Sequence, residues 1–145
     1  MEILNRKAKF EYHFVQKFEA GMALVGTEVK ALRAGEASLG EAWCHFEGDE
    51  LFLKNMHIGH YRNGPPTQHD HRRTRKLLLK AAELRKLKRK AEEKGMTIVP
   101  LRIYFSDNGY AKCEIALAQG KRSYDKRQTI KERDVQRDLA RLKKL

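Results

Sequence analysis

Two alternating apolar runs around a strong turn signal constrain the fold of this chain more than any other feature. They cover residues 98–105 and 110–117, with Asp107, Asn108 and Gly109 between them. Runs of this length, rich in β-branched and aromatic residues, favour strands, and an Asn-Gly turn typically joins two antiparallel strands. Pro100 cannot donate a backbone hydrogen bond, which predicts an edge position or a bulge at that residue.

The same alternation occurs earlier in the chain. Aromatic residues at alternate positions predict a half-buried strand over residues 10–18, and residues 22–25 predict another after a turn or bulge at Gly21. Residues 42–46 and 51–53 flank a Gly-Asp turn and predict a hairpin. Strand alternation places Tyr12, Phe14, Tyr104 and Phe105 in the core.

Two helices are predicted between the strands. The first covers residues 28–34, with Thr27 as its N-cap and Gly35 just beyond its end. The second and longer helix begins at Asp70, follows a polar surface loop, and ends at Gly95. Apolar residues recur within it at three- and four-residue spacing.

Together these elements favour a mainly β fold. We expect residues 1–120 to form a six-stranded antiparallel barrel of the oligonucleotide-binding (OB) type, with a short helix and a longer basic helix. Residues 121–145 hold ten basic and four acidic residues and few apolar ones. That composition predicts a basic C-terminal tail that is disordered in isolation.

The net charge restricts the partners of the chain. Thirty-one Lys and Arg against 19 Asp and Glu give +12 over 145 residues. Such an excess favours a polyanion, because each neutralised phosphate releases counterions. A membrane surface is the weaker alternative, since the cations are spread over several segments.

No apolar run reaches the roughly 18 residues that span a bilayer, and the N-terminus does not resemble a secretory signal. We therefore expect a cytoplasmic protein with no membrane partner.

Motifs for catalysis are not evident in the sequence. It contains no Walker loop, GxSxG or HExxH. His69, Asp70 and His71 form the one cluster that resembles a metal or acid–base site, although residues two apart on a helix point in different directions. Cys44 and Cys113 are expected to be buried, reduced thiols. We expect no enzymatic activity, cofactor or metal; a metal-dependent nuclease that uses the histidine cluster is the alternative from another class.

Four cations between residues 72 and 76 lie in the first turns of the predicted long helix. Positive charge there opposes the helix dipole unless an anion lies nearby, and a phosphate would supply one. We therefore expect Arg73, Arg75 and Lys76 to contact RNA. Tyr61 and Tyr124 lie among polar and basic residues and are candidates for stacking on bases.

Several separated motifs, in one order along nearly the whole chain, identify a family. The sequence resembles the small protein B family, the SsrA-binding proteins of bacteria. The motifs are Asn5-Arg6-Lys7-Ala8, Phe18-Glu19-Ala20-Gly21, residues 26–35 (GTEVKALRAG), residues 73–79 (RTRKLLL), Val99-Pro100-Leu101, and Gly120-Lys121 through Tyr124-Asp125-Lys126-Arg127. The resemblance implies an OB-type barrel with a helix plugging one end. It further implies binding to the tRNA-like part of transfer-messenger RNA, which is delivered with elongation factor Tu to stalled ribosomes.

The resemblance also implies roles for individual residues. The RNA surface would include Asn5, Arg6, Glu19, Leu78 and Lys112, beside the basic cluster. The tail would enter the empty mRNA channel at the decoding centre of the small subunit and form a helix from about residue 130. The tail residues implicated are Tyr124, Asp125, Lys126, Arg127, Lys131, Arg133 and Arg137. We expect a monomer that acts one-to-one with its RNA; a generic OB-fold ribosomal or assembly protein is the alternative.

Overall fold

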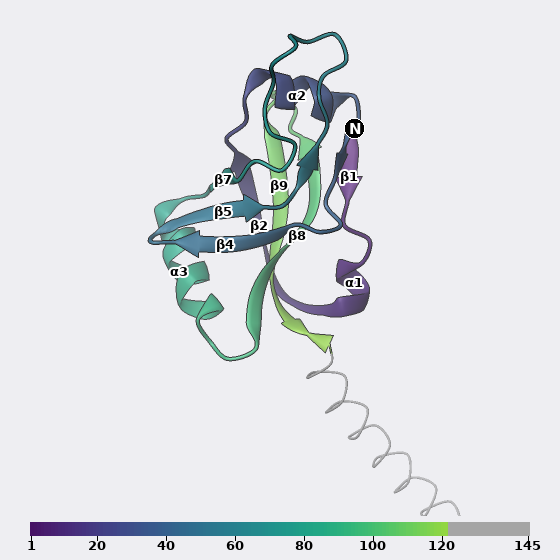
Figure 1. The fold of residues 1–145 in the computed structure, drawn as a ribbon. Helices are drawn as coiled ribbons and strands as arrows, with labels where there is room; N and C mark the ends of the chain where they lie inside the picture. Colours follow the sequence, from purple (N-terminus) through teal and green to yellow (C-terminus); the bar gives the residue numbers. More distant parts are fainter. Residues whose placement is uncertain (122–145) are drawn as a thin grey trace, which may run out of the picture.

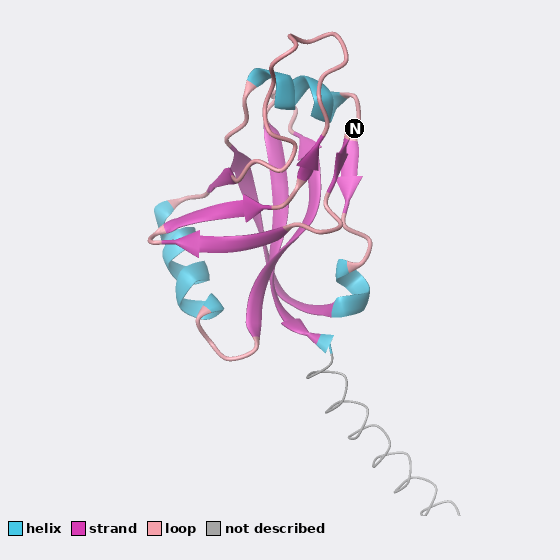
Figure 2. Ribbon diagram, viewed as in Figure 1, coloured by secondary structure: helices cyan, strands magenta, loops and turns pink. Residues whose placement is uncertain are grey.

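The computed structural model describes residues 1–121 of the chain, which form nine strands and three helices (Figures 1 and 2). The strands are β1 (Glu2–Leu4), β2 (Tyr12–Met22), β3 (Ala37–Ser38), β4 (Trp43–Glu47), β5 (Glu50–Lys54), β6 (His57–Ile58), β7 (Arg75–Leu78), β8 (Met96–Phe105) and β9 (Ala111–Gly120). The helices are α1 (Ala8–Glu11), α2 (Gly26–Arg33) and α3 (Ala81–Ala91).

Seven of these strands form one antiparallel sheet. Their order is β1-β8-β9-β2-β7-β5-β4, and β3 and β6 pair separately. The long strands β2, β8 and β9 lie side by side, while the β4–β5 hairpin crosses them (Figure 1). β4, at one end of the order, packs beside β8, next to the other end. The sheet therefore curves back towards itself around its apolar face.

The core lies inside this curve. Strand alternation turns Phe18, Ala20 and Met22 of β2 inward, where they meet Cys113 and Ile115 of β9. The helices cover different parts of the sheet. α2 lies across one end and inserts the fully buried Leu32, whereas α3 packs on β8 and β9 and buries Leu87. α1 lies at the opposite end from α2, close to the last residues of β9 (Figure 1).

The turn signals of the sequence are confirmed. The β8–β9 turn has Gly109 at φ 83°, and Ser106 N–H donates to the Tyr110 carbonyl at 2.9 Å. The β8–β9 register shifts between Pro100 and Arg102, which is the bulge expected at the proline. Gly35 follows α2 at φ 77°, as predicted for a residue just past a helix. The β4–β5 hairpin is also confirmed.

The predicted long helix from Asp70 is wrong over its first half. Residues 75–78 form strand β7, and helix α3 begins only at Ala81. Arg75 and Leu77 are buried while Leu78 is exposed, which is the alternation of a strand. Leu77 faces inward from β7, and the apolar residues that follow it lie on the inward face of α3. Their combined spacing therefore imitates that of one continuous helix.

Further expectations about strands and helices are corrected. The described residues form nine strands, not six, because β1, β3, β6 and β7 were not predicted and the strand predicted over residues 22–25 is absent. Met22 ends β2, and Val25 is the N-cap of α2 in place of Thr27. Phe10 lies on α1 with 80% of its surface exposed, so it is not part of the strand predicted over residues 10–18. Among the described residues, no helix has the length and apolarity needed to cross a membrane.

Candidate RNA interface

The outward face of the sheet brings together three of the residues assigned to RNA. Gly21 of β2 pairs with Leu78 on one side and with Lys112 on the other, and Glu19 is two positions along the same strand. Their neighbours Ala20 and Cys113 point inward, so these side chains share the outer face. Residues far apart in sequence therefore converge because β2 lies between β7 and β9.

Gly21 lies close beside Leu78. A methyl group added at Gly21 would lie 3.4 Å from the Leu78 Cβ, at van der Waals contact with it. Leu78 is 50% exposed although it is apolar. Half of this apolar side chain is therefore open to a partner at the centre of the row.

Strand β8 extends the same face beyond Lys112. Tyr104 pairs with Lys112 in the ladder, and the Arg102 guanidinium lies 4.2 Å from the Tyr104 ring centre. Arg102 also forms ion pairs with Glu114 at 3.4 Å and Glu2 at 3.5 Å. Burial raises the pKa of Tyr104 to about 12, and hydrogen bonding to the Glu19 carboxylate adds to the shift. Acidic and basic groups thus alternate across the sheet, and the tyrosine stays protonated.

Asn5 and Arg6 line a cleft of about 500 Å³ beside this face. The Asn5 side chain donates to the Pro100 carbonyl at 2.8 Å, and its backbone N–H donates to the Leu101 carbonyl at 2.8 Å. The bulge at Pro100 thus holds Asn5 in place. The cleft is also lined by the cations Lys9, Lys17 and Arg102 and by the rings of Phe10 and Phe14. Cations that neutralise phosphates, beside rings that stack on bases, are the usual elements of a single-stranded RNA site.

Sequence reasoning missed several members of this surface. Lys17 could have been found, because it is in phase with Glu19 on a strand of period two. Tyr104 was assigned to the core, yet it faces outward and is half-buried. Phe10 was expected in a half-buried strand, because the alternation of aromatic residues continues through the short helix α1.

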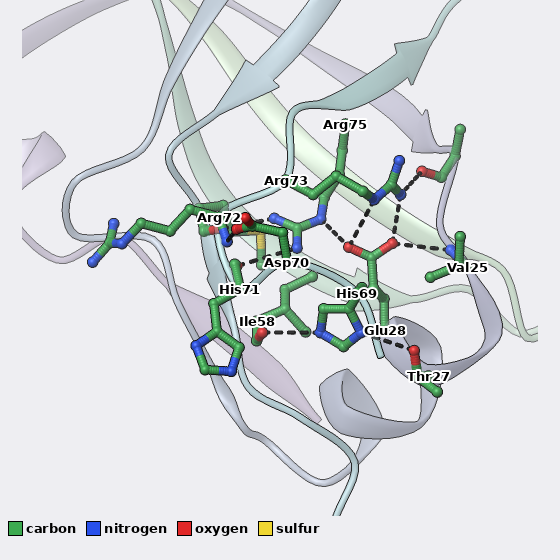
Figure 3. Close-up of polar contacts among 12 residues, drawn as sticks. Val25, Thr27, Glu28, Ile58, His69, Asp70, His71, Arg72, Arg73 and Arg75 are labelled. Carbon is green, nitrogen blue, oxygen red and sulfur yellow. Dashed lines mark hydrogen bonds and ion pairs between the residues drawn. The ribbon is translucent and has the colours of Figure 1, made fainter. Parts of the chain in front are cut away.

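The basic cluster of residues 72–76 contributes one of its side chains, Arg75, to the interior of the fold. Arg75 has no exposed surface, and its Nε donates to Glu28 Oε2, while Arg73 Nη2 donates to Glu28 Oε1 at 2.5 Å (Figure 3). Arg75 also donates to the Met56 carbonyl at 2.7 Å. The expectation that Arg75 contacts RNA is therefore corrected: it was based on a helix start that does not exist, and the side chain is enclosed by the fold.

Glu28 is a fully buried carboxylate that both arginines enclose. Burial opposes its ionisation, but hydrogen bonds from Arg73, Val25 and Arg75 outweigh that effect and hold the pKa of the carboxyl below its ordinary value. The network joins α2 to the first residues of β7. Arg73 keeps part of its side chain exposed, and Lys76 faces outward in an ion pair with Glu50 at 3.5 Å. Both side chains are therefore partly open to solvent.

The histidine cluster does not form a metal site. His69 is buried, and its ring is bonded to Thr27 and to the carbonyls of Ile58 and Gly59. Asp70 accepts from the Arg72 backbone N–H at 2.8 Å. Within residues 1–121, no group of three or more His, Cys, Asp or Glu residues is arranged to hold a metal ion. The described residues therefore do not supply the metal cluster that the nuclease alternative required.

Two expectations remain, one for the cysteines and one for the tail. Cys44 and Cys113 are buried free thiols, as predicted, and burial raises the pKa of each. The tail residues assigned to the ribosome lie outside the described residues. They are Tyr124, Asp125, Lys126, Arg127, Lys131, Arg133 and Arg137.

Comparisons with known proteins bear on the whole chain. The SmpB protein family model matches residues 2–145. An SsrA-binding protein of Cytophaga hutchinsonii is 50% identical over 143 residues, which cover 99% of this chain and 94% of the relative. One of Salinispora tropica is 56% identical over 137 residues, covering 94% and 86%. A solved chain described as "tmRNA-SmpB: a journey to the center of the bacterial ribosome" is 48% identical, with a TM-score of 0.70, covering 83% of this chain and 84% of that one. With a family model matched from the second residue to the last and half of all positions shared with such relatives, the chain belongs to the SmpB protein family.

Proposed function

We propose that this protein binds the tRNA-like domain of transfer-messenger RNA and brings it to stalled ribosomes for trans-translation. The observation that carries the proposal is the convergence of Glu19, Leu78 and Lys112 around Gly21 on one outward face. Membership of the SmpB family, whose relatives are named SsrA-binding proteins, supports the identity of the RNA. The related chain solved under a description that joins tmRNA, SmpB and the bacterial ribosome supports the second partner.

The chemistry of the outward face suits a folded RNA. Lys112, together with Lys17 and Arg6 of the adjoining cleft, would neutralise phosphates. Glu19 would accept hydrogen bonds from base amino groups or ribose hydroxyls, which phosphate contacts cannot replace. Leu78 would pack against a base or sugar. An acid and an apolar residue within a basic surface favour a defined RNA shape over any polyanion.

The curved sheet supports the finer description as an OB-type barrel. β4 lies beside β8, so the ends of the strand order approach one another, and α2 covers one end. Closure of this kind presents the outer face of β2, β9 and β8 as a rigid platform. A rigid platform fixes the spacing of its contact residues before RNA binds, which lowers the entropy lost on binding.

Residues 121–145 complete the proposal as a ribosome-probing tail. Tyr12 pairs with Gly120, so the barrel ends where β9 meets the first residue of β2, beside α1. We propose that the tail enters the vacant mRNA channel of the small subunit, with Tyr124 stacking on ribosomal RNA. Elongation factor Tu would take part through the charged RNA, and the protein would act as a monomer in the cytoplasm, without catalysing a reaction itself.

Competition binding tests the proposal directly. The full chain and a chain ending at Gly120 would be titrated with the tRNA-like domain of transfer-messenger RNA in the presence of excess tRNA. We expect selective binding by both chains, and loss of peptide tagging on stalled ribosomes only for the shortened chain. Equal affinity for bulk tRNA would overturn the choice of RNA and leave a generic RNA-binding protein of the ribosome.

A further inference from the structure

Four of the six histidines of the chain meet in one place, away from the outward sheet face. The ring centres of His60 and His71 are 4.1 Å apart, those of His57 and His71 are 5.0 Å apart, and those of His60 and His69 are 5.4 Å apart. His57 lies in β6, and the other three lie in the segment between β6 and β7. This segment passes over α2 (Figure 1). The proposed RNA interface does not include these rings.

Hydrogen bonds to two of the rings hold the segment down. His69 Nε2 lies 3.0 Å from the Ile58 carbonyl oxygen and 3.1 Å from that of Gly59 (the Ile58 contact is drawn in Figure 3), and its Nδ1 lies 2.8 Å from Thr27 Oγ1 of α2. His60 Nε2 lies 3.0 Å from the His69 carbonyl oxygen. Carbonyls only accept, so each Nε2 carries its hydrogen and each ring is complete in its neutral form. The neutral His69 then accepts from the Thr27 hydroxyl.

The charges around the cluster disfavour additional protons. Arg75 donates to the His71 carbonyl at 3.3 Å, and Lys30 of α2 lies 5.3 Å from the ring centre of Tyr61, next to His60. The segment also carries Arg62, Arg72 and Arg73, and Glu36, which follows α2, meets it through its backbone carbonyl. Glu28 is already paired with two arginines. Asp70, and Glu36, which lines a pocket with His60, are the nearby carboxylates that can offset added positive charge.

Desolvation lowers the pKa of His71, and the imidazoles of His60, His57 and His69 lower it further, while Asp70 acts in the opposite direction. A histidine whose pKa is lower in the folded than in the unfolded state binds fewer protons when folded. Its environment therefore costs no stability above the ordinary histidine pKa of about 6.5, and becomes destabilising as the pH falls below that value.

We infer that the four-histidine cluster is a proton-operated latch: neutral imidazoles hold the segment between β6 and β7 against α2, and protonation in mild acid releases it. A second cation within 4 to 5 Å of another imidazolium repels it, and the Thr27–His69 hydrogen bond must reverse direction. Release would also loosen the residues that lead into Arg73 and Arg75. The latch would therefore link the acidity of the surroundings to the anchoring of β7.

Nuclear magnetic resonance of the ring protons tests the latch in the full chain without RNA. We expect the pKa of His71 to lie below the ordinary histidine value of about 6.5. In His60→Gln the titration midpoint of His71 should move upward, whereas His45→Gln, which alters a histidine outside the cluster on β4, should leave it unchanged. A His71 midpoint that is the same in all three chains would overturn the inference.

Thermal unfolding provides a second readout. Lowering the pH from 7.5 to 5 should reduce the Tm of the wild type by a few degrees more than that of His71→Gln, because the variant has lost one repelling charge. His45→Gln should show no such shift, and His57→Gln substitutes if His71→Gln does not fold. Parallel curves for all chains would contradict the latch. Both measurements are independent of RNA, so their failure would leave the proposed function intact.

Discussion

Two regions of this molecule place a carboxylate among cations, and they use it in opposite ways. Glu28 is fully buried, and Arg73, Arg75 and the Val25 backbone satisfy both of its oxygens. Glu19 lies exposed on the outer sheet face near Lys112 and Tyr104. The first carboxylate uses its hydrogen-bonding capacity within the fold, while the second is exposed to solvent, where we propose that RNA binds. Similar residue types therefore serve structure or recognition according to the side of the strand or helix on which they lie.

Replacing Glu28 should have the largest effect. Glu28→Gln removes the charge and leaves two guanidinium groups near the interior without their partner. We expect the free energy of unfolding to fall by about 3–5 kcal/mol in urea denaturation. The matched control is Glu50→Gln, whose exposed ion pair with Lys76 at 3.5 Å should contribute no more than about 1 kcal/mol. Equal losses of unfolding free energy in the two variants would contradict the distinction between a buried, structural carboxylate and an exposed one.

The acid dependence of the Glu28 variant sharpens the same contrast. The pKa of Glu28 is lowered from 4.5 by its partners. Its stabilising contribution is therefore complete above pH 4.5 and is lost as the pH falls through the lower folded-state pKa. The stability gap between the wild type and Glu28→Gln should narrow in that acid range. A gap that is constant with pH would show that the charge of Glu28 is not what stabilises the fold.

Replacing Lys112 should weaken RNA binding without unfolding the protein. Lys112→Ala should reduce the slope of log K against log salt by about 1, because one phosphate contact is lost. Its free energy of unfolding should change by no more than about 0.5 kcal/mol. Lys94→Ala, just beyond α3 and away from the outer face, provides the matched control and should leave the slope unchanged. Identical slopes for the two variants would remove Lys112 from the interface.

Tyr104 offers the smallest but most specific signal. One tyrosine should ionise near pH 12 in an ultraviolet titration, and that step should be missing in Tyr104→Phe. Because the pKa is raised in the folded state, the stabilisation is complete below about pH 10 and declines as the pH rises towards 12. Tyr110→Phe, which alters an exposed tyrosine in the β8–β9 turn, should retain the high step. Retention of that step in Tyr104→Phe instead would contradict the packing of Tyr104 against its neighbours.

Local signals in the sequence predicted much of the fold. The β4–β5 and β8–β9 hairpins, the bulge at Pro100 and the two buried thiols follow from turn residues and alternation that act over a few positions. The start of β7 could not be predicted in this way, because Arg75 is buried only through its pairing with Glu28, 47 residues earlier. An arginine in a basic segment is normally expected at the surface. Here the carboxylate of Glu28, far away in the sequence, allows Arg75 to be buried.

The candidate site was predicted in part, and largely through family resemblance. Glu19, Leu78 and Lys112 do not stand out by charge or periodicity, and only the pairing of β2 with both β7 and β9 brings them together. Lys17 was accessible to strand parity alone, since it is in phase with Glu19. Phe10 was misassigned because alternation of aromatic residues looks the same whether it crosses a strand or a single turn of helix.

The arrangement of the sheet ends has a consequence for self-association. β1, at one end, is three residues long and begins with Glu2, and β4, at the other, is shielded by β8. Exposed strand edges are the usual templates for edge-to-edge aggregation, and short, charged or covered edges suppress it. This sheet offers a second copy little unpaired backbone to extend. A strongly basic protein that must remain available to RNA is thereby kept from adding to its own sheet.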